Sequence, residues 1–212
     1  MANGQGPDLG LFLGILPTLQ CIEALHMIIG AFAAAVYGTA RITYDIDIVM
    51  RLEEEHIHAL AAAYPPPRYY VDPVQMRESI EMGILFNIID TDRGEKADLV
   101  PLTMDSRYQR AFQCRVRQRV EVPGAAPSEV WCARPGDVIV GKLMAWEEGR
   151  LRKHKTDIFE MMVFHYLADQ SQGMAFEEDH VDARAKELGQ EVVDFWKALK
   201  QAAREEAKQA EG

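Results

Sequence analysis

The chain has 212 residues, of which 48% are hydrophobic and 26% charged, values typical of a globular protein with a buried core. Its 33 acidic residues exceed its 23 Lys and Arg residues, so the net charge at pH 7 is −10. A protein that coats nucleic acid or binds anionic membranes would be basic overall, so the composition disfavours both classes. A local basic groove is still compatible with this composition.

The cysteines and the apolar N-terminal stretch both bear on location. The chain has three cysteines with no close pair: Cys21, Cys114 and Cys132. This pattern predicts neither a disulfide framework nor a cysteine zinc site, and reduced thiols are typical of cytoplasmic proteins. Residues 9–36 are mostly apolar, but Pro17 and Glu23 interrupt them, and the first ten residues contain no Lys or Arg. We therefore expect a cytoplasmic protein with no membrane span and no signal peptide.

The first half of the chain alternates helical and strand patterns. Apolar periodicity and turn-forming residues predict a helix over 9–24, a strand over 26–29, a helix over 31–37, a strand over 41–50 and a helix over 52–64. Gly30 and Gly38 bound the short second helix, and three prolines at 65–67 end the third.

The second half adds a hairpin and several helices. The pattern predicts strands over 84–90 and 96–102 with a turn at 91–94, a strand over 115–122, helices over 137–146 and 156–167, and a charged helical tail from Asp179. This order departs from a regular βαβ array and predicts an α+β fold with a mixed β-sheet and packed helices. We expect one domain over 1–170 and a helical C-terminal tail over 171–212.

Three aspartates are the candidate chemical groups. Asp45 and Asp47 lie two residues apart on a predicted strand, so their side chains point to the same face. Paired carboxylates repel each other unless a cation or a shared proton intervenes, and such oxygen ligands suit Mg²⁺. A solvated pair at a strand end is the plain alternative. Asp98 lies on a second apolar strand, and Gly30 with Ala31 opens a helix whose N-terminus can approach a phosphate.

Residues 28–50, IIGAFAAAVYGTARITYDIDIVM, resemble the signature of the nucleotidyltransferase superfamily that includes DNA polymerase beta. The chain is most similar to the small prokaryotic stand-alone and abortive-infection-type branch, whose order of Tyr-Gly, Arg-x-Thr and Asp-Ile-Asp it shares. A second, weaker block runs from Arg134 through Lys142-Leu143 to Asp157-Ile158. The resemblance covers roughly residues 20–165 and implies a polymerase-beta-like core.

The resemblance also implies a role for individual residues. Asp45, Asp47 and Asp98 would bind Mg²⁺, and Asp98 would also help to activate the attacking hydroxyl. Gly30 and Ala31 would line the phosphate end, although Ala31 stands where the family usually has Gly or Ser. Arg41 and Lys142 are candidates for contacts to the triphosphate; a surface salt bridge for Arg41 and a surface position for Lys142 are the alternatives.

The implied activity is Mg²⁺-dependent transfer of an NMP from an NTP to a hydroxyl acceptor, with release of pyrophosphate. The acceptor would be tRNA, a protein or a small molecule, the last including an antibiotic. A different class is also open: a non-catalytic binding partner with the same fold, such as one half of a toxin–antitoxin pair.

Two further patterns bear on partners. Arg115, Arg117 and Arg119 alternate along a predicted strand and would present a basic face to a polyanion such as tRNA. An exposed face paired with the acidic tail is the alternative. The tail carries a heptad seam of Val181, Ala185, Leu188, Val192, Phe195, Leu199 and Ala202. We expect this seam to dock on its own domain, with homodimerisation as the alternative.

Overall fold

The computed structural model describes residues 10–40, 43, 45–120, 127–167 and 176–210. The chain forms two compact units. Unit 1 consists of Met1–Ile28 and Thr43–Cys132, and unit 2 of Ile29–Ile42 and Ala133–Gly212. The expected boundary near residue 170 falls in a segment outside the described residues, so the division into a 1–170 domain and a 171–212 tail stays a prediction. No helix in the described ranges is long and apolar enough to cross a membrane.

A seven-stranded mixed sheet runs in the order β3-β4-β5-β2-β1-β7-β6. Its strands are β1 (Leu25–Ile29), β2 (Ile46–Arg51), β3 (Tyr69–Tyr70), β4 (Phe86–Asp90), β5 (Glu95–Pro101), β6 (Val116–Val120) and β7 (Ser128–Cys132). The pairs β2–β5 and β1–β7 are parallel, whereas β3–β4, β4–β5 and β6–β7 are antiparallel. With the helices described below, this sheet confirms the predicted α+β class.

Unit 1 also contains helices α1 (Gly10–Cys21), α3 (Glu54–Ala63), α4 (Pro73–Met82) and α5 (Arg107–Gln113). The start of α1 is fastened to β5, because the Leu11 N–H donates to Glu95 Oε2 at 2.8 Å. The predicted hairpin is confirmed as β4–β5. Asp90 stabilises its turn, since its carboxylate accepts hydrogen bonds from the backbone N–H groups of Asp92 and Arg93.

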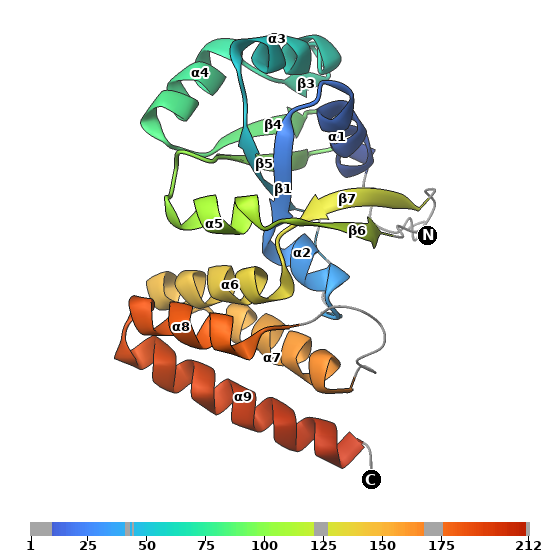
Figure 1. The fold of residues 1–212 in the computed structure, drawn as a ribbon. Coiled ribbons are helices and arrows are strands. Elements are labelled where there is room, and N and C mark those ends of the chain that lie inside the picture. The colour runs from blue at the N-terminus through green and yellow to red at the C-terminus, as the bar shows by residue number, and fades with distance from the viewer. Residues whose placement is uncertain (1–9, 41–42, 44, 121–126, 168–175, 211–212) are drawn as a thin grey trace. The chain divides into compact units, whose positions relative to one another are not determined.

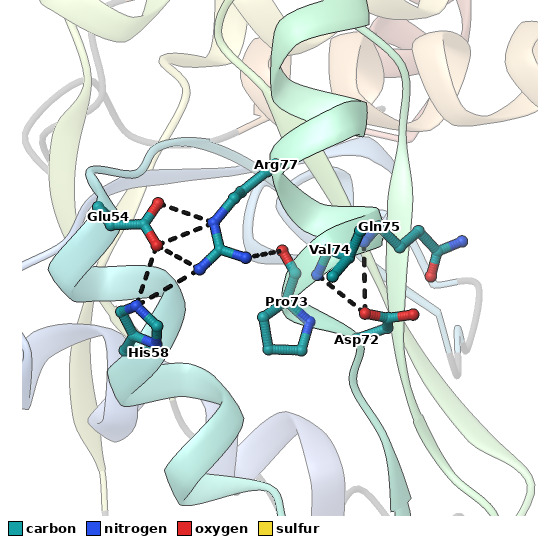
Figure 2. Close-up of polar contacts among 7 residues, drawn as sticks. All are labelled: Glu54, His58, Asp72, Pro73, Val74, Gln75 and Arg77. Carbon is teal, nitrogen blue, oxygen red and sulfur yellow. Dashed lines mark hydrogen bonds and ion pairs between the residues drawn. The ribbon is translucent and has the colours of Figure 1, made fainter.

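Helices α3 and α4 are joined by charged side chains (Figure 2). Arg77 of α4 donates through Nε to Glu54 of α3 at 2.8 and 2.9 Å, and His58 lies 3.0 Å from the same carboxylate. The hydrogen bond from Arg77 is the main cause of a lowered pKa for Glu54. Because Glu54 and His58 are largely exposed and Arg77 is half-buried, we expect this cluster to orient the helices more than to stabilise them.

The start of α4 has a capping residue whose effect can be measured. Asp72 accepts hydrogen bonds from the N–H groups of Val74 at 2.8 Å and Gln75 at 3.4 Å (Figure 2). Replacing Asp72 with alanine leaves these donors without the cap and should lower the free energy of unfolding by about 1 kcal/mol. Urea denaturation checks this value. Asp72→Asn keeps an acceptor oxygen and should retain most of the stability; an equal loss in both variants would contradict the capping role.

Unit 2 is helical. It comprises α2 (Gly30–Val36), α6 (Pro135–Gly149), α7 (Arg152–Leu167), α8 (Glu178–Leu188) and α9 (Gln190–Ala210). In Figure 1 the four long helices lie alongside one another, with α9 against α7 and α8. The tail therefore packs on the chain's own helices, as predicted. Trp146 of α6 and Phe195 of α9 stack with ring centroids 3.6 Å apart.

Gly189 interrupts the heptad seam of the tail. Gly189, with φ of 115°, separates α8 from α9, so the heptad register does not run through. Val192 and Leu199 of the predicted seam are buried in α9, but Ala202 is exposed and Ala203 is buried in its place. The interruption at Gly189 is already visible in the sequence and favours docking on the chain's own helices over a continuous coiled coil.

Candidate functional site

Two of the predicted aspartates face each other across a strand pair. Asp47 of β2 and Asp98 of β5 are register partners in the parallel pairing. Register partners project to the same face of a sheet. Their neighbours Ile48 and Leu99, also register partners, are fully buried on the opposite face. The two carboxylates therefore lie side by side on one face of the sheet, and both residues are half-buried.

Two residues not predicted from the sequence hold the Asp98 carboxylate. Asn87 of β4 is the antiparallel register partner of Asp98, and its Nδ2 donates to Asp98 Oδ1. Lys96 lies two residues before Asp98 on the same strand face, with its Nζ 3.0 Å from both carboxylate oxygens. Asp98 thus has a fixed orientation and a cation beside it.

Lys96 is affected by the charges of all three predicted aspartates. The hydrogen bond to Asp98 is the main cause of a raised pKa for Lys96. The negative charges of Asp98, Asp45 and Asp47 act in the same direction, while burial opposes them. The negative charges of all three predicted carboxylates therefore favour the protonated form of Lys96. Asp45 itself precedes β2 and is exposed.

The carboxylates do not form a closed metal cage. Within the described ranges, no group of three or more His, Cys, Asp and Glu side chains is placed to hold a metal ion. Mg²⁺ commonly binds through one or two protein carboxylates, with substrate phosphates and water filling its other positions. The facing pair of Asp47 and Asp98 fits that mode. The metal roles of Asp45, Asp47 and Asp98 stay predictions.

The other predicted site residues belong to unit 2 or lie outside the description. Gly30 and Ala31 begin α2, and Gly30 has φ of 69°, a conformation that favours glycine. Lys142 lies inside α6, 5% exposed, and forms an ion pair with the buried Asp157 of α7. The alternative that placed Lys142 on the surface is therefore wrong. Arg41 lies outside the described residues. Contacts of Gly30, Ala31, Arg41 and Lys142 with a nucleotide stay predictions.

The basic strand has more partners than its sequence shows. Arg117 and Arg119 are exposed on β6, while Arg115 precedes the strand and is half-buried. Arg117 pairs with Glu129 of β7 at 3.3 Å, so part of its charge is already compensated. The continuous basic face expected from alternation is thus reduced, and binding of tRNA stays a prediction.

Lys96 gives the site a testable electrostatic property. Because its ammonium occupies Asp98, replacing Lys96 with glutamine should make divalent cations bind more tightly. The pair is part-exposed, so the gain should be modest, about two- to fivefold in Mn²⁺ affinity. Electron paramagnetic resonance of free Mn²⁺ measures it. Lys153→Gln, an exposed change on α7, is the control. Weaker Mn²⁺ binding in Lys96→Gln would show that this lysine does not compete for the carboxylates.

Neither a protein-family model nor a curated protein matches this chain. Among solved structures, it is similar to an antigenic nucleotidyltransferase-like protein from Paracoccidioides brasiliensis, with 17% identity, TM-score 0.47, and coverage of 91% of this chain and 92% of that one. It is also similar to the antibiotic-resistance factor ANT(2'')-Ia, with 17% identity, TM-score 0.42, and coverage of 96% and 95%. A third similar structure is JHP933 from Helicobacter pylori, with 12% identity, TM-score 0.43, and coverage of 95% and 92%. At these identities and TM-scores, the likenesses concern the fold alone.

Proposed function

We propose that the chain is a Mg²⁺-dependent nucleotidyltransferase that moves an NMP from an NTP to a hydroxyl acceptor and releases pyrophosphate. The observation that carries this proposal is the register pairing of Asp47 and Asp98 on parallel strands. Two ionised carboxylates placed together on a half-buried face repel each other, which costs free energy unless a cation lies beside them. Lys96 shows that cationic charge is favourable at this place.

In the proposed reaction, the carboxylates and Lys96 have separate roles. Asp45, Asp47 and Asp98 would hold Mg²⁺, which supplies neutralisation of the triphosphate charge. The acceptor oxygen attacks the α-phosphorus, the bond to pyrophosphate breaks, and the acceptor proton passes to the Asp98 carboxylate. Asn87 would keep that carboxylate oriented. Lys96 is long and 45% exposed, so its ammonium can move from Asp98 to a phosphate oxygen when the nucleotide enters.

Label transfer tests this function. Each α-labelled NTP would be incubated with the protein and Mg²⁺ in the presence of tRNA, of the protein alone or of a small hydroxylated antibiotic. We expect label to move to one acceptor class and to depend on Mg²⁺. Transfer would identify the nucleotide and the acceptor together. Absence of transfer in every mixture, with no Mg²⁺–NTP binding, would overturn the proposal.

A non-catalytic binding protein is the second candidate, and three observations favour it. Lys96 already neutralises the charge of Asp98 without any metal. Among the described residues, no group of three or more His, Cys, Asp and Glu side chains is placed to hold a metal ion. Ala31 in place of the usual Gly or Ser agrees with a lost phosphate contact. In such a protein, for example half of a toxin–antitoxin pair, Asp98→Asn would alter stability while leaving partner binding unchanged. The cytoplasmic location and the homodimer that the sequence suggests also remain predictions.

A further inference from the structure

A pocket lies in unit 1, and none of the predicted aspartates lines it. It has a volume of about 390 Å³ and is formed by the end of α1, the start of β1 and the β6–β7 hairpin. Such a volume is in the range of small-molecule sites. The charge of Arg51, the last residue of β2, acts on Arg115 in the pocket wall, whereas Asp47 lies near the start of that strand. The pocket is therefore at the other end of β2.

His26 contributes a buried hydrogen-bond acceptor to this pocket. The residue is 2% exposed, and its Nδ1 lies 2.8 Å from the Ala24 carbonyl oxygen. Because a carbonyl only accepts, Nδ1 carries the proton, and Nε2 is left as an acceptor. Burial lowers the pKa of His26, and this keeps the ring neutral. Nε2 is fully buried and has no hydrogen-bond partner, which buried polar atoms rarely lack.

Arg115 contributes a buried donor to the same pocket. Its Nη1 donates to the Phe112 carbonyl oxygen at 2.7 Å, and its guanidinium carbon lies 4.4 Å from the Phe112 ring centroid and 5.0 Å from that of Trp131. Its Nε is buried without a hydrogen-bond partner. No carboxylate in the described part of the chain forms an ion pair with it. A half-buried guanidinium that has no counter-ion among the described residues, and whose Nε has no acceptor, is a typical feature of an anion site.

We infer that this pocket binds a small hydroxylated anion. Arg115 Nε and His26 Nε2 are both covered in the unliganded pocket, so the side chains around them shift when the ligand enters. An anionic oxygen of the ligand then accepts from Arg115 Nε, and a ligand hydroxyl donates to His26 Nε2. The anionic group then gives Arg115 Nε a hydrogen-bond partner, and the hydroxyl gives one to His26 Nε2. Glu23 and Glu129 also line the pocket, and their negative charges disfavour large polyanions. The charge of Glu129 is partly compensated by Arg117. This inference does not depend on nucleotidyl transfer.

The proposal can be tested with the full chain and simple probes. Glycerol 3-phosphate and glycerate carry a phosphate or a carboxylate next to hydroxyl groups, and glycerol lacks the anion. We expect one or both anions to bind saturably at millimolar concentration and to shift the ¹⁵N resonance of His26 Nε2. The anion that binds with the higher affinity shows whether the pocket prefers a phosphate or a carboxylate. Glycerol should not bind. Absence of binding by both anions, or equal binding of glycerol, would overturn the proposal.

Matched variants then assign the contacts. Arg115→Gln should weaken the stronger anion about tenfold or more, because a charge-assisted hydrogen bond is lost. Arg110→Gln, on the exposed surface of α5, should leave the affinity unchanged. His26→Asn keeps a donor near the Ala24 carbonyl and removes Nε2, and it should also weaken binding. Unchanged affinity in both Arg115→Gln and His26→Asn would contradict the assigned contacts. Should Arg115→Gln fail to fold, the His26 resonance of the unmodified protein still decides whether the anion binds there.

Discussion

Replacing Asp47 with asparagine is expected to reduce nucleotidyl transfer at least a hundredfold while the protein stays folded. Asparagine has nearly the same shape but no negative charge, so the pair with Asp98 would no longer stabilise a cation. Removal of one group that stabilises transition-state charge costs about 10²- to 10³-fold in rate. Asp98→Asn should have a similar effect. Label transfer from the α-labelled NTP measures the rate, and thermal unfolding checks the fold.

Asp92→Asn is the matched control for this pair. Asp92 is exposed in the turn of the β4–β5 hairpin, and only its backbone N–H contributes to the turn contact described above. The same substitution there should leave transfer unchanged. Full activity in Asp47→Asn and in Asp98→Asn would contradict the catalytic account and favour the binding protein.

The second large effect is expected at Lys142, inside unit 2. Lys142 and Asp157 form an ion pair in which both residues are nearly fully buried, at 5% and 1% exposure. Lys142→Met leaves a buried carboxylate without this cation and should lower the free energy of unfolding by about 3–5 kcal/mol. Guanidinium denaturation measures the loss.

A double variant separates the charge effect from packing. Lys142→Met with Asp157→Leu removes both charges and should recover most of the lost stability. Lys153→Met, an exposed change on α7, should have no measurable effect. A stable Lys142→Met protein that has lost transfer would instead support the contact to the triphosphate predicted from the sequence.

The elements that the sequence predicts well have strong local signals. The strands of the β4–β5 hairpin alternate around a tight turn, and β2 is an apolar run, so their positions follow from period and turn chemistry. Helix α4 was missed although Asp72 and Pro73 form a capping signal, because only Met76 and Ser79 are buried along it. Strand β3 has two residues, too few for any pattern. Helix α5 and strand β7 were missed as well.

The candidate site was predictable in part. Asp47 and Asp98 were found because each lies in an apolar strand, but their direct opposition depends on the parallel pairing of β2 with β5, which no local pattern specifies. Lys96 could have been found, since it lies two residues from Asp98 on the same strand face. Asn87 could not, because its contact depends on the hairpin register. The pocket at His26 depends on buried atoms, which sequence does not reveal.

Direct binding of Mn²⁺ in the presence of an NTP tests the central claim without any knowledge of the acceptor. Electron paramagnetic resonance would compare the unmodified protein with Asp47→Asn, Asp98→Asn and Asp92→Asn. We predict NTP-dependent binding of Mn²⁺ in the unmodified protein and in Asp92→Asn, and its loss in the other two. Equal binding in all four proteins, or no binding in any of them, would show that the facing aspartates do not hold a metal–nucleotide complex.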